Sequence, residues 1–297
     1  MKNKNILFFA LLIISFSIIG CVDIDSGYVS LSDPVEAGND NEGNLTVHFI
    51  DVGQGDSILI ETPNGNTMLI DGGSRSEGVT VIKYLNQLDI STINVMVATH
   101  PHEDHIGGLN DVLSNFNVLQ VYDPGVVHTS QTYENFLLEI DAKNIDYTIG
   151  KAGHSIDLDP NIAIEIISPE IIDEDELNDD SIVIKMTYHD VSFLFTGDAE
   201  SPPENAMVQN YNVDATILKV GHHGSSSSTS QTFLNEVSPE VAIISEGVDN
   251  SYGHPTSSTL NKLESVGAYV YRTDIHGTVI VSTDGYTYNV NTEYWLT

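Results

Sequence analysis

Four side chains that can bind divalent cations fall within six positions of this chain. They lie in the segment THPHEDHIGG, residues 99–108, which follows an apolar stretch that reads as a strand. Side chains two positions apart in an extended backbone point to the same side, so His100 and His102 can share one ion. Asp104 and His105 turn toward a second ion if a helix begins there, and the closing Gly-Gly pair lets other backbone approach. The fold must therefore place residues 99–108, called the metal loop below, at the end of a buried strand.

Three later segments carry further groups of this kind. Asp198 in FTGDAE ends an apolar strand, where a carboxylate can bridge two cations, although an Asp at such a position is also a common helix cap. LKVGHHGS offers His222 and His223 after another strand, and SYGHP offers His254 in a turn. The other histidines stand alone and are expected to be surface or packing residues: His48, His128, His154, His189 and His276. With one cysteine in the chain, these sites must use nitrogen and oxygen ligands.

The N-terminus reads as an export signal. Two lysines, an apolar run too short to span a membrane comfortably and a small residue precede Cys21. This order predicts a signal peptide at residues 1–20, and residues 18–21 resemble the lipobox of lipoproteins, in which the cysteine is acylated. An uncleaved anchor with an incidental cysteine is the alternative. Residues 21–44 are polar and predict a flexible tether, so the expected folded domain is 45–297, held at the outer face of the cell membrane.

The charge is strongly negative, with 10 basic and 43 acidic residues and a formal net charge of -33. Self-repulsion on this scale favours a soluble chain, expected to be a monomer, and argues against a broad basic face for polyanions. Adaptation to a saline setting explains such a composition without any reference to substrate. The charge alone therefore does not identify what the chain binds.

The folded region is predicted to be α+β. Strands outnumber helices and come in two runs, each with helices attached, which predicts two mixed sheets packed face to face with helices outside, a four-layer αββα arrangement. Helices are expected at residues 78–88, 107–114, 132–143, 202–209, 229–236 and 257–266. Strands are expected at residues 45–51, 56–62, 67–73, 93–100, 163–168, 181–188, 192–197, 215–220, 241–245, 268–272 and 277–283.

These segments together resemble the metallo-β-lactamase superfamily, whose HxHxDH signature is matched in full at residues 100–105. The similarity is closest to the β-lactamase-like domain of the competence protein ComEC and its free-standing relatives. The blocks DVGQGDSILIETPNGNTMLIDGG, NDDSIVIKM, FTGDAE, LKVGHHGS and YGHP follow in that group's order and cover about residues 45–285. The resemblance implies a metallo-β-lactamase sandwich and a metal-dependent hydrolase.

The resemblance also implies a site with two divalent metal ions, zinc by default and manganese as the competitor. His100 and His102 would hold the first ion, and Asp198 would bridge the two. Asp104, which is also expected to take part in catalysis, would hold the second ion together with His105 and His222.

Further residues are expected around these ligands. His223 and His254 are expected to contact substrate or to protonate a leaving group. Asp71 is expected to support the metal loop through hydrogen bonds, and Asp51 and Asp56, which flank the Gly-rich turn of DVGQGD, are expected to do similar work. Many superfamily members have a third histidine on the first ion where this chain has LNDDS. Asp180 in that segment either completes the shell or belongs to a solvated acidic loop.

The expected function is hydrolysis of a phosphodiester, a small molecule or nucleic acid, by hydroxide generated on the two ions. The ComEC-like domain is thought to act on DNA entering the cell, so a DNA-uptake channel is a candidate partner, besides the membrane reached through Cys21. Two alternatives remain open. One is a hydrolase of other esters, lactones or amides, including β-lactams. The other is a non-catalytic metal-binding surface protein.

Overall fold

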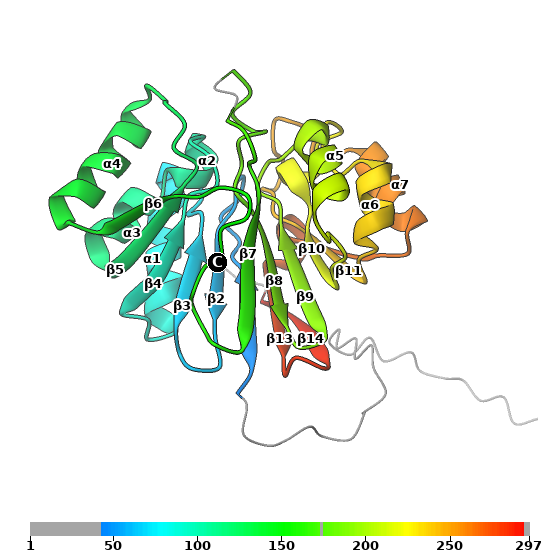
Figure 1. Cartoon of the computed structure of the whole chain (residues 1–297), viewed down its shortest axis with the longest axis horizontal. Helices are drawn as coiled ribbons and strands as arrows, with labels where there is room; N and C mark the ends of the chain where they lie inside the picture. Colours follow the sequence, from blue (N-terminus) through cyan, green and yellow to red (C-terminus); the bar gives the residue numbers. More distant parts are fainter. Residues whose placement is uncertain (1–42, 173–174, 294–297) are drawn as a thin grey trace, which may run out of the picture.

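Two β-sheets lie face to face between two layers of helices in this computed structural model, which describes residues 43–172 and 175–293 (Figure 1). Helices α1 to α4 cover the outer side of one sheet, and α5 to α7 cover the outer side of the other. The α+β, four-layer αββα prediction is therefore confirmed. The predicted signal peptide and nearly all of the predicted tether lie outside the described residues. Within the described part of the chain, no helix has the length and apolar character needed to cross a bilayer.

The first sheet has eight strands in the order β14-β13-β1-β2-β3-β4-β5-β6. Neighbouring strands are antiparallel from β14 to β3, so that β1, β2 and β3 form a meander, and pairing is parallel from β3 to β6. Its strands are β1 (Leu45–Phe49), β2 (Ile58–Glu61), β3 (Thr67–Ile70), β4 (Thr92–Val97), β5 (Asn117–Asp123), β6 (Asp146–Ile149), β13 (Thr278–Thr283) and β14 (Tyr288–Glu293).

The second sheet has six strands in the order β12-β11-β10-β9-β8-β7. It is antiparallel from β7 to β9 and parallel from β9 to β12, so each sheet has one antiparallel and one parallel half. Its strands are β7 (Ile162–Ser168), β8 (Val183–Tyr188), β9 (Val191–Phe195), β10 (Ile217–Lys219), β11 (Val241–Ile244) and β12 (Tyr269–Arg272).

Apolar side chains fill three interfaces between the four layers. One cluster joins the two sheets, with Phe49 and Phe195 in contact across it. A second lies under α1, α3 and α4, and a third under α5, α6 and α7. The helices are α1 (Gly78–Gln87), α2 (Glu103–Ile106), α3 (Leu109–Asn115), α4 (Gln131–Lys143), α5 (Ser201–Asn210), α6 (Gln231–Val237), α7 (Ser257–Ser265) and α8 (Thr273–His276), with short 3-10 turns η1 (Arg75–Glu77) and η2 (Gly221–Gly224).

Most expected elements are present to within a few residues, and the differences have local causes. The strands β5, β6 and β14 were not expected, because alternate or exposed polar residues break their apolar pattern. The helix expected at residues 107–114 is α3, and the short helix α2 precedes it. The two are separate because the backbone nitrogen of Gly108 donates to the carbonyl oxygen of Gly73 instead of continuing α2. Glycine is needed at this close approach, since a Cβ on Gly108 would meet the carbonyl oxygen of Gly72 at 2.1 Å.

The loops that carry the predicted ligands leave the strands at one end of the two sheets. The metal loop follows β4, Asp71 follows β3, Asp198 follows β9 and the His222–His223 pair follows β10. In parallel strands the carboxyl ends meet at the same edge, which is where open α/β sheets bind ligands. Thus segments more than a hundred residues apart in sequence are brought together.

Candidate metal centre

The metal loop changes from extended to helical backbone within its own ligands. His102 has extended dihedral angles and caps the N-terminus of α2, and Asp104 and His105 lie in that helix. The expected turn into a helix at this point is therefore present. His105 is fully buried, whereas the side chain of Asp104 is 30% exposed, so the loop places one ligand inside and one at the rim.

One group of ligand atoms surrounds the position expected for a second ion. Nε2 of His105 lies 3.3 Å from Oδ1 of Asp198, and Nε2 of His223 lies 3.6 Å from the same oxygen and 3.5 Å from Oδ2 of Asp104. The two Nε2 atoms and Oδ1 of Asp198 are buried without a hydrogen-bond partner. Buried polar atoms left in this way cost free energy, and two imidazoles with two carboxylates are a donor set that suits a divalent cation. The residues present therefore fit a metal ion.

The placement of the histidine pair differs from the sequence-based assignment. His223, expected near substrate, lies beside Asp104 and His105, whereas His222, expected as their partner, does not. Nε2 of His222 is instead 3.7 Å from Oδ2 of Asp198. Both histidines have left-handed backbone angles, which direct neighbouring side chains in ways that strand alternation does not predict.

A second group lies on the other side of Asp198. Nε2 of His100 is 3.9 Å from Oδ2 of Asp198 and 2.9 Å from Nδ1 of His102. His100, His105 and Asp198 are all buried and offer ligand atoms within 4.8 Å of one another. The carboxylate of Asp198 therefore faces one histidine cluster with each oxygen, as expected of a bridging ligand.

Asp71 holds the metal loop by three hydrogen bonds. Its carboxylate accepts from the backbone nitrogen of Thr99 at 2.8 Å, from Oγ1 of Thr99 at 2.7 Å and from Nδ1 of His105 at 2.7 Å. Because a carboxylate only accepts, Nδ1 of His105 is the donor in this contact, and Nε2 is the nitrogen that faces the site. Such outer contacts fix the ring orientation and raise ligand basicity. Asp71 thus lies where the expected supporting role requires it.

Burial and charge perturb the ionisation of the central groups. Burial and the charge of His105 hold the pKa of His100 well below its usual value, so this imidazole is neutral. Burial would raise the pKa of Asp198, but the charges of His105 and His223 outweigh it and hold this pKa well below the usual value. Burial would lower the pKa of His105, yet the carboxylates of Asp198 and Asp71 raise it well above the usual range. The buried charges are therefore mutually compensated.

Two further carboxylates were expected to support the metal loop. Oδ1 of Asp51 accepts from the backbone nitrogen of Gly53, and its backbone nitrogen donates to Thr278, so these contacts are within its own turn and with the start of β13. Asp180 is buried, lines a hollow beside Pro169 and Pro202, and directly precedes Ser181 in the chain. The roles expected for Asp51 and Asp180 at the metal loop stay predictions.

Further residues make supporting contacts to the histidines. Asp56, which was expected together with Asp51 to support the site, lies 3.5 Å from Nδ1 of His223 and pairs with the buried Lys219 at 2.8 Å. Oγ of Ser181 lies 3.4 Å from Nδ1 of His100 and accepts from the backbone nitrogen of Asp198. Glu200 accepts from Nδ1 of His222 at 3.0 Å. Sequence reasoning assigned no role to Ser181 or Glu200, which lie one residue from Asp180 and two residues from Asp198.

A hollow of about 280 Å³ opens onto these ligands. His254 lies on the wall of this hollow. The centroid of its ring is 5.7 Å from that of His222 and 5.9 Å from that of Tyr252, and the rings of His254 and Tyr252 are stacked. Asn250 holds the backbone of His254 from both sides, accepting from its nitrogen and donating to its oxygen. Gln54, Asn178 and Tyr252 also line the hollow, and no sequence motif singled them out.

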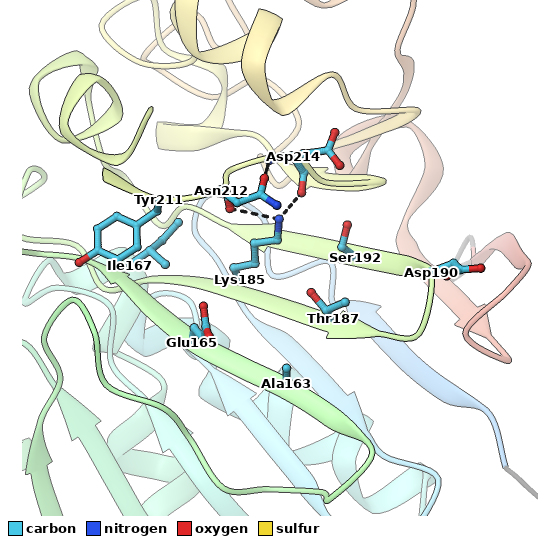
Figure 2. Close-up of a pocket in the computed structure, with 10 residues that line it drawn as sticks. All are labelled: Ala163, Glu165, Ile167, Lys185, Thr187, Asp190, Ser192, Tyr211, Asn212 and Asp214. Atoms are coloured by element: carbon cyan, nitrogen blue, oxygen red, sulfur yellow. Dashed lines mark hydrogen bonds between the residues drawn. The ribbon is translucent and has the colours of Figure 1, made fainter. Parts of the chain in front are cut away.

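A larger hollow of about 420 Å³ lies elsewhere, over strands β7, β8 and β9 (Figure 2). At its centre Lys185 donates hydrogen bonds to the backbone oxygens of Asn212 and Asp214. None of its ten lining residues is a histidine. The convergence of unpaired ligand atoms, rather than size, therefore identifies the candidate site.

The fold and these ligands define a class of metal-dependent hydrolases. The profile of the metallo-beta-lactamase superfamily matches residues 50–247, and the chain belongs to this superfamily. It is 30% identical over 251 residues, 78% of this chain, to ComE operon protein 3 of Bacillus subtilis, and 29% identical over 85% of this chain to competence protein ComA of Neisseria gonorrhoeae. The chain spans about a third of each relative, 32% and 34%.

A solved structure gives the same fold. Igni18, described as a novel metallo hydrolase from the archaeon Ignicoccus hospitalis, superposes with a TM-score of 0.50 at 16% identity, covering 79% of this chain and 98% of its own. The chain is thus a metallo-β-lactamase superfamily protein related to ComEC-like competence proteins.

Proposed function

We propose that this chain hydrolyses phosphodiesters with two divalent cations, zinc or manganese, held on either side of Asp198. The observation that carries the proposal is the pair of ligand groups facing the two oxygens of one carboxylate, open to a hollow on one side. When bound, two such ions supply a nucleophile from water at neutral pH and neutralise charge at the attacked centre. A phosphodiester benefits most, because its attack brings an anion against an anion.

The residues of the hollow bind and orient substrate in this proposal. Gln54 and Asn178 carry amide groups, and the exposed ring of Tyr252 stacks on His254 at the rim. Burial and the charges of His222 and His223 lower the pKa of His254, so this imidazole is neutral at pH 7 and offers one N–H group. A neutral N–H donor beside the ligands suits a phosphoryl or leaving-group oxygen.

The hollow supplies no cationic side chain of its own. None of its ten lining residues is Lys or Arg. Lys219, the nearest lysine in sequence to the histidine pair, is fully buried and paired with Asp56, so it cannot contact a substrate. Recognition of the phosphodiester would therefore depend on the two cations. The binding of long nucleic acids normally uses lysine and arginine side chains, and this hollow provides none.

The test is turnover of bis-p-nitrophenyl phosphate by the full chain with Zn²⁺ or Mn²⁺. We expect divalent-dependent release of p-nitrophenol that EDTA stops and that added metal restores. His254→Gln is expected to lower the rate at unchanged metal content, by roughly 10²-fold or more if the imidazole assists proton transfer. The matched control is His154→Gln, which changes an exposed histidine outside the hollow and should leave the rate unchanged.

Parallel assays distinguish phosphodiester hydrolysis from hydrolysis of other esters, lactones or amides. Nitrocefin, a lactone, a thioester and a short oligonucleotide are offered under the same conditions. Faster turnover of the esters or of nitrocefin would replace the phosphodiester proposal by the broader ester or amide hydrolase. Failure of every substrate with both metals would favour a surface protein that binds metal without catalysis.

We also propose that Cys21 anchors the chain as a lipoprotein at the outer face of the cell membrane. The support is the order of residues at the N-terminus and the match of residues 18–21 to a lipobox. Cys21→Ser is expected to move the protein from the membrane fraction to the soluble fraction of cells, with Ser26→Ala as the control that should not. Equal membrane retention of both variants would contradict acylation at Cys21.

A further inference from the structure

The first of the two proposed ions lacks a third histidine where many superfamily members place one. Between the metal loop and Asp198 the chain has three histidines. His128 hydrogen-bonds Ser130 and contacts the ring of Tyr133, His154 is exposed, and His189 stacks on Tyr286. None of the three lines the hollow or belongs to a ligand group in the described part of the chain. None of these three histidines therefore joins His100, His102 and one oxygen of Asp198 at this ion.

His222 reaches this side of Asp198. Its Nε2 lies 3.7 Å from Oδ2 of Asp198, the same oxygen that lies 3.9 Å from Nε2 of His100. Donor atoms that share one ion at about 2.0–2.2 Å lie roughly 3–3.5 Å apart. Both nitrogens therefore lie only a few tenths of an ångström beyond this range from the shared oxygen. The other oxygen, Oδ1, faces His105 and His223 instead.

The ring of His222 is oriented as a ligand. Its Nδ1 lies 3.0 Å from Oε1 of Glu200, and because the carboxylate accepts, Nδ1 donates and Nε2 keeps its lone pair toward Asp198. Asn178 donates to the same oxygen of Glu200 at 3.2 Å and so supports the carboxylate. His223 repeats the arrangement, with Nδ1 donating to the backbone oxygen of Ser245 at 2.9 Å. A proton donated outward and a lone pair directed inward is the usual state of metal-bound imidazole.

The backbone separates the two rings. His222 has φ 48° and ψ 48°, and His223 has φ 52° and ψ 24°, so two consecutive non-glycine residues lie in the left-handed region. Such a conformation is strained in a non-glycine residue and persists only where the surrounding structure holds it, and these conformations cluster at functional sites. The rings end 6.2 Å apart and 74° inclined. One histidine thus faces each oxygen of Asp198.

We infer that His222 is the third histidine of the first ion. The GHHG turn then supplies one ligand to each ion: His222 joins His100 and His102, and His223 joins Asp104 and His105. The inference rests on the proposed two-ion function and states which residue replaces the histidine absent from the usual block. Glu200 is a positioning residue for His222 in this arrangement.

The experiment counts metal ions bound to the folded full chain, by inductively coupled plasma mass spectrometry after dialysis against limiting Mn²⁺ or Zn²⁺. The unsubstituted chain and the control His154→Ala are expected to hold two ions. His222→Ala should hold one, because loss of a direct ligand weakens the first ion by at least about 100-fold, the upper end of the effect of losing an outer-shell partner. His222→Gln serves as the second variant if the alanine variant does not give a native circular dichroism spectrum.

Double substitutions assign the ion that is lost. His100→Ala with His222→Ala should still hold one ion, because both residues serve the same one, whereas His222→Ala with His223→Ala should hold none. The reverse pattern would overturn the inference and return His222 to the second ion. Two ions in both His222 variants would overturn it as well and leave His222 as a substrate contact.

The two proposals fail in distinguishable ways. At most one ion in the unsubstituted chain would contradict the two-ion function itself. Two ions there and two in the His222 variants would contradict only the assignment of His222.

Discussion

Asp198→Asn is expected to abolish phosphodiester hydrolysis, with a loss of at least about a thousandfold in kcat/KM. The amide keeps the shape of the side chain but removes the charge that faces both histidine clusters. A bound cation contributes several kcal/mol to the stabilisation of the reaction, and each 1.36 kcal/mol is about tenfold in rate. Asp198 is 2% exposed, so water cannot replace the missing carboxylate.

The same variant should lose metal from both sites. Oδ1 of Asp198 lies 3.3 Å from Nε2 of His105 and 3.6 Å from Nε2 of His223. Oδ2 lies 3.9 Å from Nε2 of His100 and 3.7 Å from Nε2 of His222. Metal content and bis-p-nitrophenyl phosphate turnover are measured on one preparation, with circular dichroism to show that the fold is retained. Asp190→Asn, an exposed Asp in the turn between β8 and β9, is the matched control and should behave like the unsubstituted chain. A folded Asp198→Asn protein that keeps two ions and full activity would refute the bridging role.

Local sequence was sufficient to predict which loops meet at the candidate metal centre. An apolar strand followed by His100 and His102 fixes both the strand and the side to which the two imidazoles point, since alternation in extended backbone is a short-range property. Asp71 and Asp198 each follow an apolar strand in the same way, and the structure brings both to the metal loop. The four-layer arrangement could be predicted because the strands come in two runs, each with helices attached.

The choice between two adjacent histidines could not be predicted in this way. It depends on left-handed dihedral angles at His222 and His223, which favour glycine and are imposed by the surrounding packing rather than by the residues themselves. Similarly, the contact of Ser181 with His100 depends on how the loop enters β8, which the local sequence does not determine. The joining of β13 to β1 also depends on a pairing between residues more than two hundred positions apart.

A second large effect is expected at the buried pair of Asp56 and Lys219, neither of which lines the hollow. Asp56→Ala should lower the free energy of unfolding by about 3–5 kcal/mol, the usual cost of leaving one charge of a buried pair uncompensated. Nζ of Lys219 lies 2.8 Å from Oδ2 of Asp56, and the two residues are 0% and 1% exposed. The only other hydrogen bond found for this ammonium group in the described structure goes to the backbone oxygen of Val220. Chemical denaturation followed by circular dichroism measures the change.

Two comparisons separate the buried charge from a general effect of losing a carboxylate. Glu139→Ala breaks the partly exposed pair with Lys143 and should cost less than about 1 kcal/mol. Asp56→Leu combined with Lys219→Met removes both charges and should be more stable than either single variant, because neither charge is then buried without a partner. Since Asp56 also lies 3.5 Å from Nδ1 of His223, the double variant is expected to fold while binding the second ion more weakly. If Asp56→Ala cost no more than Glu139→Ala, the pair would have no part in holding the DVGQGD turn against β10.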